Sequence, residues 1–115
     1  MVEFKRAGNS LIVRLTGEID EEKAKALRSK IDVEFDEAMA MDLIFDLSKV
    51  SFMDSTGIGM IIGRYKRAAA LGGSVKVFGA DRVVKRIIEL SGLGRIVKIY
   101  ATEEAAVGKA GVTND

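Results

Sequence analysis

The residues best suited to chemistry lie in one run, Asp54-Ser55-Thr56-Gly57-Ile58-Gly59, between an apolar strand-like segment and an apolar helix-like segment. A hydroxyl at the start of a helix can cap the free backbone N–H groups of the first turn. The same N–H groups and the positive end of the helix dipole favour a phosphate carried by that hydroxyl. The run therefore indicates either an ordinary helix cap at Ser55 or a phosphorylation site there.

Three glycines, Gly57, Gly59 and Gly63, fall within the predicted helix, although each costs about 1 kcal/mol relative to alanine in a helix interior. Close packing on the sheet is the explanation we expect for Gly63. For Gly57 and Gly59, packing and close approach by another molecule's backbone both stay open. The spacing is a near-miss to a dinucleotide fingerprint, because Ile62 stands where the third glycine belongs, and there is no Gly-Lys-Ser/Thr P-loop.

The composition excludes several classes of function. The 115 residues contain no cysteine and no histidine. These absences exclude thiolate catalysis, disulfides, a Ser-His-Asp triad, phosphohistidine transfer, and metal sites built on cysteine or histidine. The 18 basic residues nearly balance 17 acidic ones and tryptophan is absent, so we expect no nucleic-acid partner. We expect no cofactor, no metal and no catalysis by the chain itself.

The length and hydropathy predict a single domain over residues 1–115. No apolar run approaches the roughly 18 residues that a membrane helix needs, and no segment has the pattern of a signal peptide. We therefore expect a cytoplasmic protein without a membrane span. The tail beyond Gly108 is expected to be frayed.

Strands and helices alternate along the chain after an initial hairpin. The hairpin is predicted from strands at 2–5 and 11–15 joined by Gly8-Asn9. Later strands are predicted at 43–46, 75–78 and 96–100, and helices after Asp20, from about 56 to 71, from Ala80 or Asp81 to Gly92, and after Thr102. The expected fold is therefore an α/β domain, a small mixed and mostly parallel sheet packed by about four helices.

Helical periodicity predicts which faces of the helices are buried. In the first helix the buried stripe is Ala24, Leu27, Ile31 and Phe35, and in the third the inward residues are Val83, Val84, Ile87, Ile88 and Leu90. Two basic clusters are expected on solvated helix faces: Arg64, Lys66 and Arg67, and Arg82, Lys85 and Arg86. Functional residues gather at the carboxyl ends of parallel strands, so we expect Ser55 there, beside the Glu18-Ile19-Asp20 turn.

The segment Phe52-Met53-Asp54-Ser55-Thr56-Gly57-Ile58-Gly59, followed by Gly63-Arg64-Tyr65-Lys66, resembles the phosphorylation segment of anti-sigma factor antagonists, bacterial members of the STAS domain family. The resemblance covers nearly the whole chain. It includes Leu15-Thr16-Gly17-Glu18-Ile19-Asp20, Gly72-Gly73, Val84-Lys85-Arg86 and Leu90-Ser91-Gly92-Leu93. Within the family the chain looks most like the sporulation antagonists of the sigma-F anti-sigma factor, with a stress-response antagonist as the alternative.

This resemblance implies a partner-switching function. The unphosphorylated antagonist would bind an anti-sigma factor and release the sigma factor. The anti-sigma factor would also be an ATP-dependent serine kinase for Ser55, and a PP2C-like serine phosphatase would reset the switch. The implied partner surface is Glu18, Asp20, Asp54, Ser55, Thr56, Gly57, Ile58 and Gly59. Thr56 stands where sporulation relatives carry serine, so it is a second candidate acceptor.

From the physics of the site we expect phosphate to disrupt the interface while leaving the fold nearly unchanged. Ile58 and Met60 are expected to make apolar contacts with the partner. Two other classes stay open. A small nucleotide-binding module would use Gly57 and Gly59 as a phosphate cradle, and a receiver-like domain would accept phosphate on Asp46 or Asp54.

Overall fold

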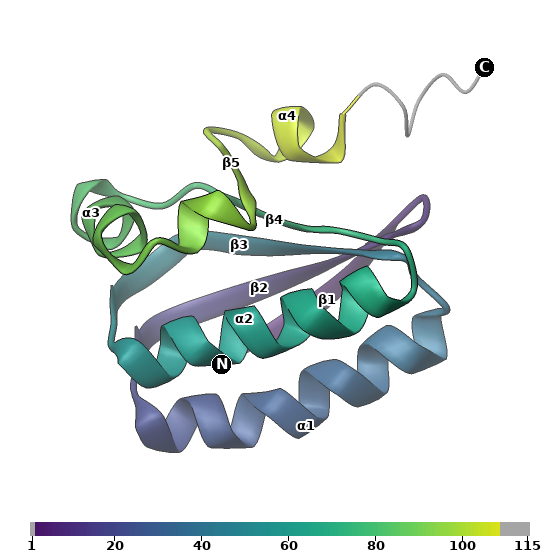
Figure 1. Cartoon of the computed structure of the whole chain (residues 1–115), viewed down its shortest axis with the longest axis horizontal. Helices are drawn as coiled ribbons and strands as arrows, with labels where there is room; N and C mark the ends of the chain where they lie inside the picture. The colour runs from purple at the N-terminus through teal and green to yellow at the C-terminus, as the bar shows by residue number, and fades with distance from the viewer. Residues whose placement is uncertain (1, 109–115) are drawn as a thin grey trace.

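The computed structural model describes residues 2–108, which form one mixed sheet with helices on both of its faces (Figure 1). The strands are β1 (Val2–Ala7), β2 (Ser10–Ile19), β3 (Asp42–Met53), β4 (Val75–Phe78) and β5 (Lys98–Tyr100). The helices are α1 (Glu21–Ala38), α2 (Ser55–Ala70), α3 (Arg82–Ser91), the 3-10 turn η1 (Leu93–Arg95) and α4 (Glu103–Val107). The tail for which fraying was expected lies outside the described residues.

The sheet has the topology that the alternation predicts. Its strands lie in chain order from β1 to β5. β1 and β2 form the antiparallel hairpin, and all later neighbours are parallel. β3 is much longer than the predicted strand at 43–46, because Leu47, Val50 and Met53 continue to bury side chains. Its last residues pair with the end of β2, where Ile19 stands opposite Met53.

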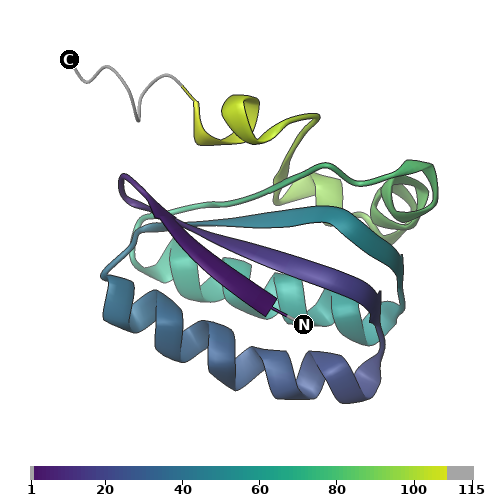
Figure 2. The same cartoon turned by 180° about the vertical axis from the view of Figure 1, so that it is seen from behind.

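The layers of the molecule are unequal. α1 and α2 pack side by side on one face of the sheet, as both views show (Figures 1 and 2). They enclose the main core, which includes Phe35, Phe45 and Ile61. The short helix α4 lies over the opposite face, where Ala106 joins a small cluster with Ile12 and Ile44. α3 packs against β3 and also contacts α2.

The first helix agrees with its sequence pattern. The carboxylate of Asp20 accepts a hydrogen bond from the backbone N–H of Lys23 at 2.9 Å, which caps α1. All four residues of the predicted stripe are buried: Ala24, Leu27, Ile31 and Phe35. The periodicity was sufficient here because one face of α1 meets the sheet and the other meets solvent.

Two predictions of burial are wrong. In α3, Val84 and Ile88 are buried, but Val83 is 54% exposed and Leu90 is 72% exposed, because only one side of this helix at the edge of the fold is covered. Arg64, expected on a solvated face, is buried, and its Nε lies 2.9 Å from Oδ1 of Asp32 on α1. Burial lowers the pKa of Arg64, which the negative charge of Asp32 opposes.

Across residues 2–108 there is no helix whose length and apolar character would let it cross a membrane.

Candidate functional site

The candidate site lies where β3 ends and α2 begins. Asp54, between them, has an extended backbone (φ −94°, ψ −172°) and is the N-cap of α2. Its Oδ1 accepts hydrogen bonds from the backbone N–H groups of Thr56 at 2.9 Å and Gly57 at 3.1 Å. The prediction that Ser55 caps the helix is therefore wrong. Asp54 takes that position, and Ser55 is the first helical residue.

The two hydroxyls beside Asp54 have different surroundings. The Thr56 hydroxyl donates a hydrogen bond to Oδ1 of Asp54. Ser55 is exposed, and its hydroxyl makes no hydrogen bond to any residue in the range 2–108. The hydrogen bond from the Thr56 hydroxyl, followed by that from the Gly57 amide, lowers the pKa of Asp54. The site thus presents a free serine hydroxyl next to an ionised carboxylate.

The acidic turn lies beside this site, as the sequence predicted. The backbone N–H of Asp54 donates to the carbonyl of Ile19 at 3.4 Å, which joins the ends of β3 and β2. Glu18 and Asp20 on either side of Ile19 are exposed. A groove of about 440 Å³ lies between the start of α1 and Asp54, lined by Asp20, Glu21, Glu22, Lys25 and Asp54.

A second groove, which the sequence did not reveal, separates the first turns of α1 and α2. Its volume is about 370 Å³, and it is lined by Glu21, Ala24, Lys25, Arg28, Thr56, Gly59 and Met60. Lys25 and Arg28 are three residues apart on α1, next to the buried stripe that contains Ala24. This spacing is the one feature of the sequence that could have indicated the groove. It places two basic residues at the rim of the groove only when α2 is known to lie beside α1.

The glycines of α2 differ from one another in their surroundings. A Cβ added to Gly57 would lie 2.5 Å from Cγ of Met53 and 2.9 Å from the carbonyl oxygen of Ile19, so packing within the chain explains this glycine. At Gly59 and Gly63 an added Cβ would meet no atom of residues 2–108 within 4 Å, apart from the neighbouring backbone of α2 itself. The expected packing role of Gly63 is therefore wrong, and Gly59 opens a bare stretch of helix to solvent.

The two apolar residues expected to contact a partner, Ile58 and Met60, are not on the surface. Ile58 is only 6% exposed, Met60 is buried as well, and both belong to the main core. They follow the helical repeat that continues to Ile61 and faces the sheet. Of the residues predicted to bind a partner, Gly57 and Ile58 can thus act only by shaping the first turn. Glu18, Asp20, Ser55, Thr56 and Gly59 are exposed, and Asp54 is half-buried.

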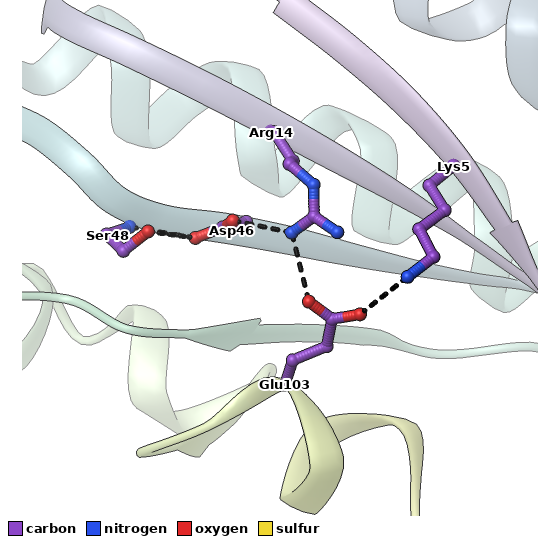
Figure 3. A network of polar contacts seen from close by, with 5 residues as sticks. All are labelled: Lys5, Arg14, Asp46, Ser48 and Glu103. Atoms are coloured by element: carbon purple, nitrogen blue, oxygen red, sulfur yellow. Dashed lines mark hydrogen bonds and ion pairs between the residues drawn. The ribbon is translucent and has the colours of Figure 1, made fainter.

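Asp46, the other candidate aspartate, is buried in a polar network on the α4 face (Figure 3). Its Oδ2 lies 2.8 Å from Nη1 of Arg14, which also lies 3.0 Å from Oε1 of Glu103, while Lys5 reaches the other oxygen of Glu103 at 3.3 Å. Burial disfavours the charge, but hydrogen bonds from Ser48 and Arg14 outweigh it and lower the pKa of Asp46.

This network argues against a receiver-like role for Asp46. A receiver domain needs an acidic cluster that binds a metal ion next to the phosphorylated aspartate. Within the described part of the chain, no three acidic side chains come together in a way that could hold a metal ion. The Asp46 carboxylate is instead held by Arg14 and Ser48, which makes it part of the fold.

Comparison with known families agrees with this geometry. A family model described as the STAS domain matches residues 1–106. The chain belongs to the STAS domain family. Among curated STAS relatives, an anti-sigma F factor antagonist of Paenibacillus polymyxa is 34% identical over 92% of this chain and 91% of its own. An anti-sigma-B factor antagonist of Bacillus subtilis is 38% identical over 92% of this chain and 95% of its own.

Solved STAS structures show the same fold. The anti-sigma factor antagonist SpoIIAA in its unphosphorylated form is 26% identical, covers both chains fully and superposes with a TM-score of 0.84. SpoIIAA of Bacillus in its phosphorylated form is 27% identical over 93% of this chain and 96% of its own, with a TM-score of 0.72. The expected fold and the resemblance to anti-sigma factor antagonists are confirmed.

Proposed function

We propose that this STAS protein is an anti-sigma factor antagonist controlled by phosphorylation of Ser55. The unphosphorylated form binds an anti-sigma factor in the cytoplasm, and the bound sigma factor is released. The anti-sigma factor is also the ATP-dependent kinase, and a PP2C-like phosphatase restores the active form. The observation that carries the proposal is the exposed Ser55 hydroxyl, free of hydrogen bonds to residues 2–108, at the first position of α2.

Ser55 is a better acceptor than Thr56 in this geometry. The Thr56 hydroxyl already donates a hydrogen bond to Asp54, so this bond would have to break before the hydroxyl could accept a phosphoryl group from ATP. The Ser55 hydroxyl requires no such loss. Two solved forms of SpoIIAA, named as unphosphorylated and phosphorylated, support a switch of this kind.

The charges around Ser55 explain how phosphate would stop binding. A phosphate adds about −1.5 to −2 charges, and the amides of Thr56 and Gly57 already hold the Asp54 carboxylate. The first turn of α2 therefore offers the phosphate less neutralisation than an uncapped helix would. The added charge stands beside Asp54 and the Glu18–Asp20 turn. A partner whose surface fits the neutral hydroxyl would have to bury this charge on binding, which weakens the complex.

Two lines of similarity bear on which process is regulated. The sequence motif favours control of sporulation, and relatives named for sigma F and for sigma B match at 34% and 38% identity. We propose sporulation, with a stress response as the alternative. Measured binding to anti-sigma F and anti-sigma-B factors in parallel separates the two.

The test of the phosphorylation site is intact-mass spectrometry with peptide mapping, after incubation with ATP and an active anti-sigma kinase. The expected result is one phosphate on the parent and on Thr56→Ala, and none on Ser55→Ala. Phosphate retained in Ser55→Ala and lost in Thr56→Ala would contradict the assignment. An adduct that neutral hydroxylamine removes would instead indicate an acyl phosphate on an aspartate, because hydroxylamine cleaves acyl phosphates and leaves phosphoserine intact.

A further inference from the structure

Several apolar side chains of α3 are not buried in the core of the protein. Val84 and Ile88 are fully buried in the core, whereas Val83 and Leu90 are exposed and Ile87 is half-buried. Residues 83, 87 and 90 are spaced i, i+4 and i+7, so they form a second stripe along one side of the helix. A helix face exposed to solvent normally carries polar side chains, so an exposed apolar stripe is typical of a binding surface.

Val83 and Ile87 of this stripe form one wall of a shallow groove. Phe52 of β3, itself 45% exposed, forms the other wall, and the groove between them has a volume of about 570 Å³. Arg82 and Arg86 of α3 complete the lining. The lining therefore consists of apolar side chains and two arginines, without an acidic residue.

The groove lies near the candidate site, at the same end of the sheet. Phe52 precedes Ser55 by three residues, and α3 follows the carboxyl end of β4, so both features occupy the same edge of the sheet (Figure 1). A partner bound over Ser55 would reach the groove by crossing the end of β3. A second copy of this chain in a symmetric contact would bring Arg82 and Arg86 close to their own counterparts, which disfavours it.

We propose that the Phe52–α3 groove binds an acidic amphipathic helix of the anti-sigma factor, as a second contact beside Ser55. This inference rests on the proposed function. The apolar face of the partner helix packs on Phe52, Val83 and Ile87, and its carboxylates face Arg82 and Arg86. Apolar grooves of this kind bind a helix through its apolar side chains at positions i, i+3, i+4 and i+7.

The test is calorimetric titration with the anti-sigma F factor of Paenibacillus polymyxa, because the 34% identical relative is named as its antagonist. Val83→Glu adds a negative charge to the groove, and Val83→Lys adds a positive charge at the same apolar cost. The matched control is Val33→Glu on α1, because Val33 is 53% exposed and Val83 is 54% exposed. Ser55→Asp tests the primary contact.

The expected result is binding at least about tenfold weaker for Val83→Glu, a smaller loss for Val83→Lys, and affinity within about twofold of the parent for Val33→Glu. Equal losses for the two Val83 variants would overturn the acidic character of the occupant. Loss with Ser55→Asp but not with Val83→Glu would overturn the groove and leave the proposed function intact. Unchanged thermal unfolding of Val83→Glu shows that the variant is folded.

If the parent does not bind this anti-sigma factor, the proposed function fails for that partner and the groove is decided separately. The probe is then a helical peptide of about 15 residues with Leu at the four anchor positions, Glu at the positions that flank them and Ala elsewhere. It is compared with the same peptide carrying Lys in place of Glu. Saturable binding of the Glu peptide alone, lost in Val83→Glu, supports the groove. Equal binding of both peptides, or of neither, overturns it.

Discussion

At the scale of single residues, two neighbouring glycines of α2 have opposite surroundings. Gly57 packs against Met53 and the backbone of Ile19, whereas the position of a Cβ at Gly59 is open. Backbone cannot move aside as a flexible side chain can. Gly57 is therefore required by the fold, and Gly59 is not.

We expect Gly57→Ala to lower the free energy of unfolding by about 1 to 3 kcal/mol, because the added methyl group overlaps its neighbours. The matched substitution Gly59→Ala should raise it by about 0.5 to 1 kcal/mol, since alanine is the better helix former. Urea titrations of the two variants and the parent measure both effects. Equal destabilisation by the two changes would show that the packing around Gly57 is not as described.

At the scale of elements, α4 depends on a charged connection to the sheet. It has only five residues and buries one of them, Ala106. Glu103 at its start binds Arg14 and Lys5, and Arg14 also holds the buried Asp46 (Figure 3). The hydrogen bond from Arg14 lowers the pKa of Glu103, and the bond to Glu103 raises the pKa of Arg14.

We expect Arg14→Met to lower the free energy of unfolding by about 1 to 2 kcal/mol at neutral pH, a value reduced by the partial exposure of the pair. Because the folded-state pKa of Asp46 and of Glu103 is lowered, their stabilisation is present above the unfolded carboxyl range. It is lost as pH falls through the folded-state values. The difference between parent and variant should therefore shrink below about pH 4.

Denaturant titrations at neutral and acidic pH provide the measurement. The matched control is Arg95→Met, because Arg95 is exposed and forms no ion pair within residues 2–108. A difference between parent and Arg14→Met that stays constant with pH would show that the carboxylates do not carry the effect. A loss of stability of the same size in Arg95→Met would show that the effect comes from the change in net charge and not from the ion pairs of Arg14.

At the scale of the whole molecule, local patterns predicted the parts of the fold that depend on local physics. Asp20 and the stripe through Phe35 were correct because capping and helical periodicity decide them within one element. The burial of Arg64 depends on Asp32 of another helix, and no local pattern contains that contact. The exposure of Val83 depends on which side of α3 the sheet leaves uncovered.

The same limit applies to the candidate site. Sequence placed Ser55 at a strand-to-helix junction beside the acidic turn, and the structure agrees. It did not separate Asp54 from Ser55 as the cap, since aspartate and serine are both good caps and are adjacent. Only the extended backbone at Asp54 and its hydrogen bonds to Thr56 and Gly57 decide the question.

We also expect the fold to be nearly unchanged when Ser55 is phosphorylated. The side chain is exposed and the first turn of α2 is already capped by Asp54, so the phosphate replaces no internal contact. Backbone amide NMR spectra of the two forms should differ only near residues 52–60 and the Glu18–Asp20 turn. Widespread shift changes through β4 and α4 would contradict a local switch.

The most direct test of the central claim is the affinity of the anti-sigma factor for the unmodified protein and for the protein phosphorylated on Ser55. We predict that phosphate weakens binding roughly a thousandfold, equivalent to about 4 kcal/mol. Equal affinity of the two forms would contradict the proposal that Ser55 controls the partner switch.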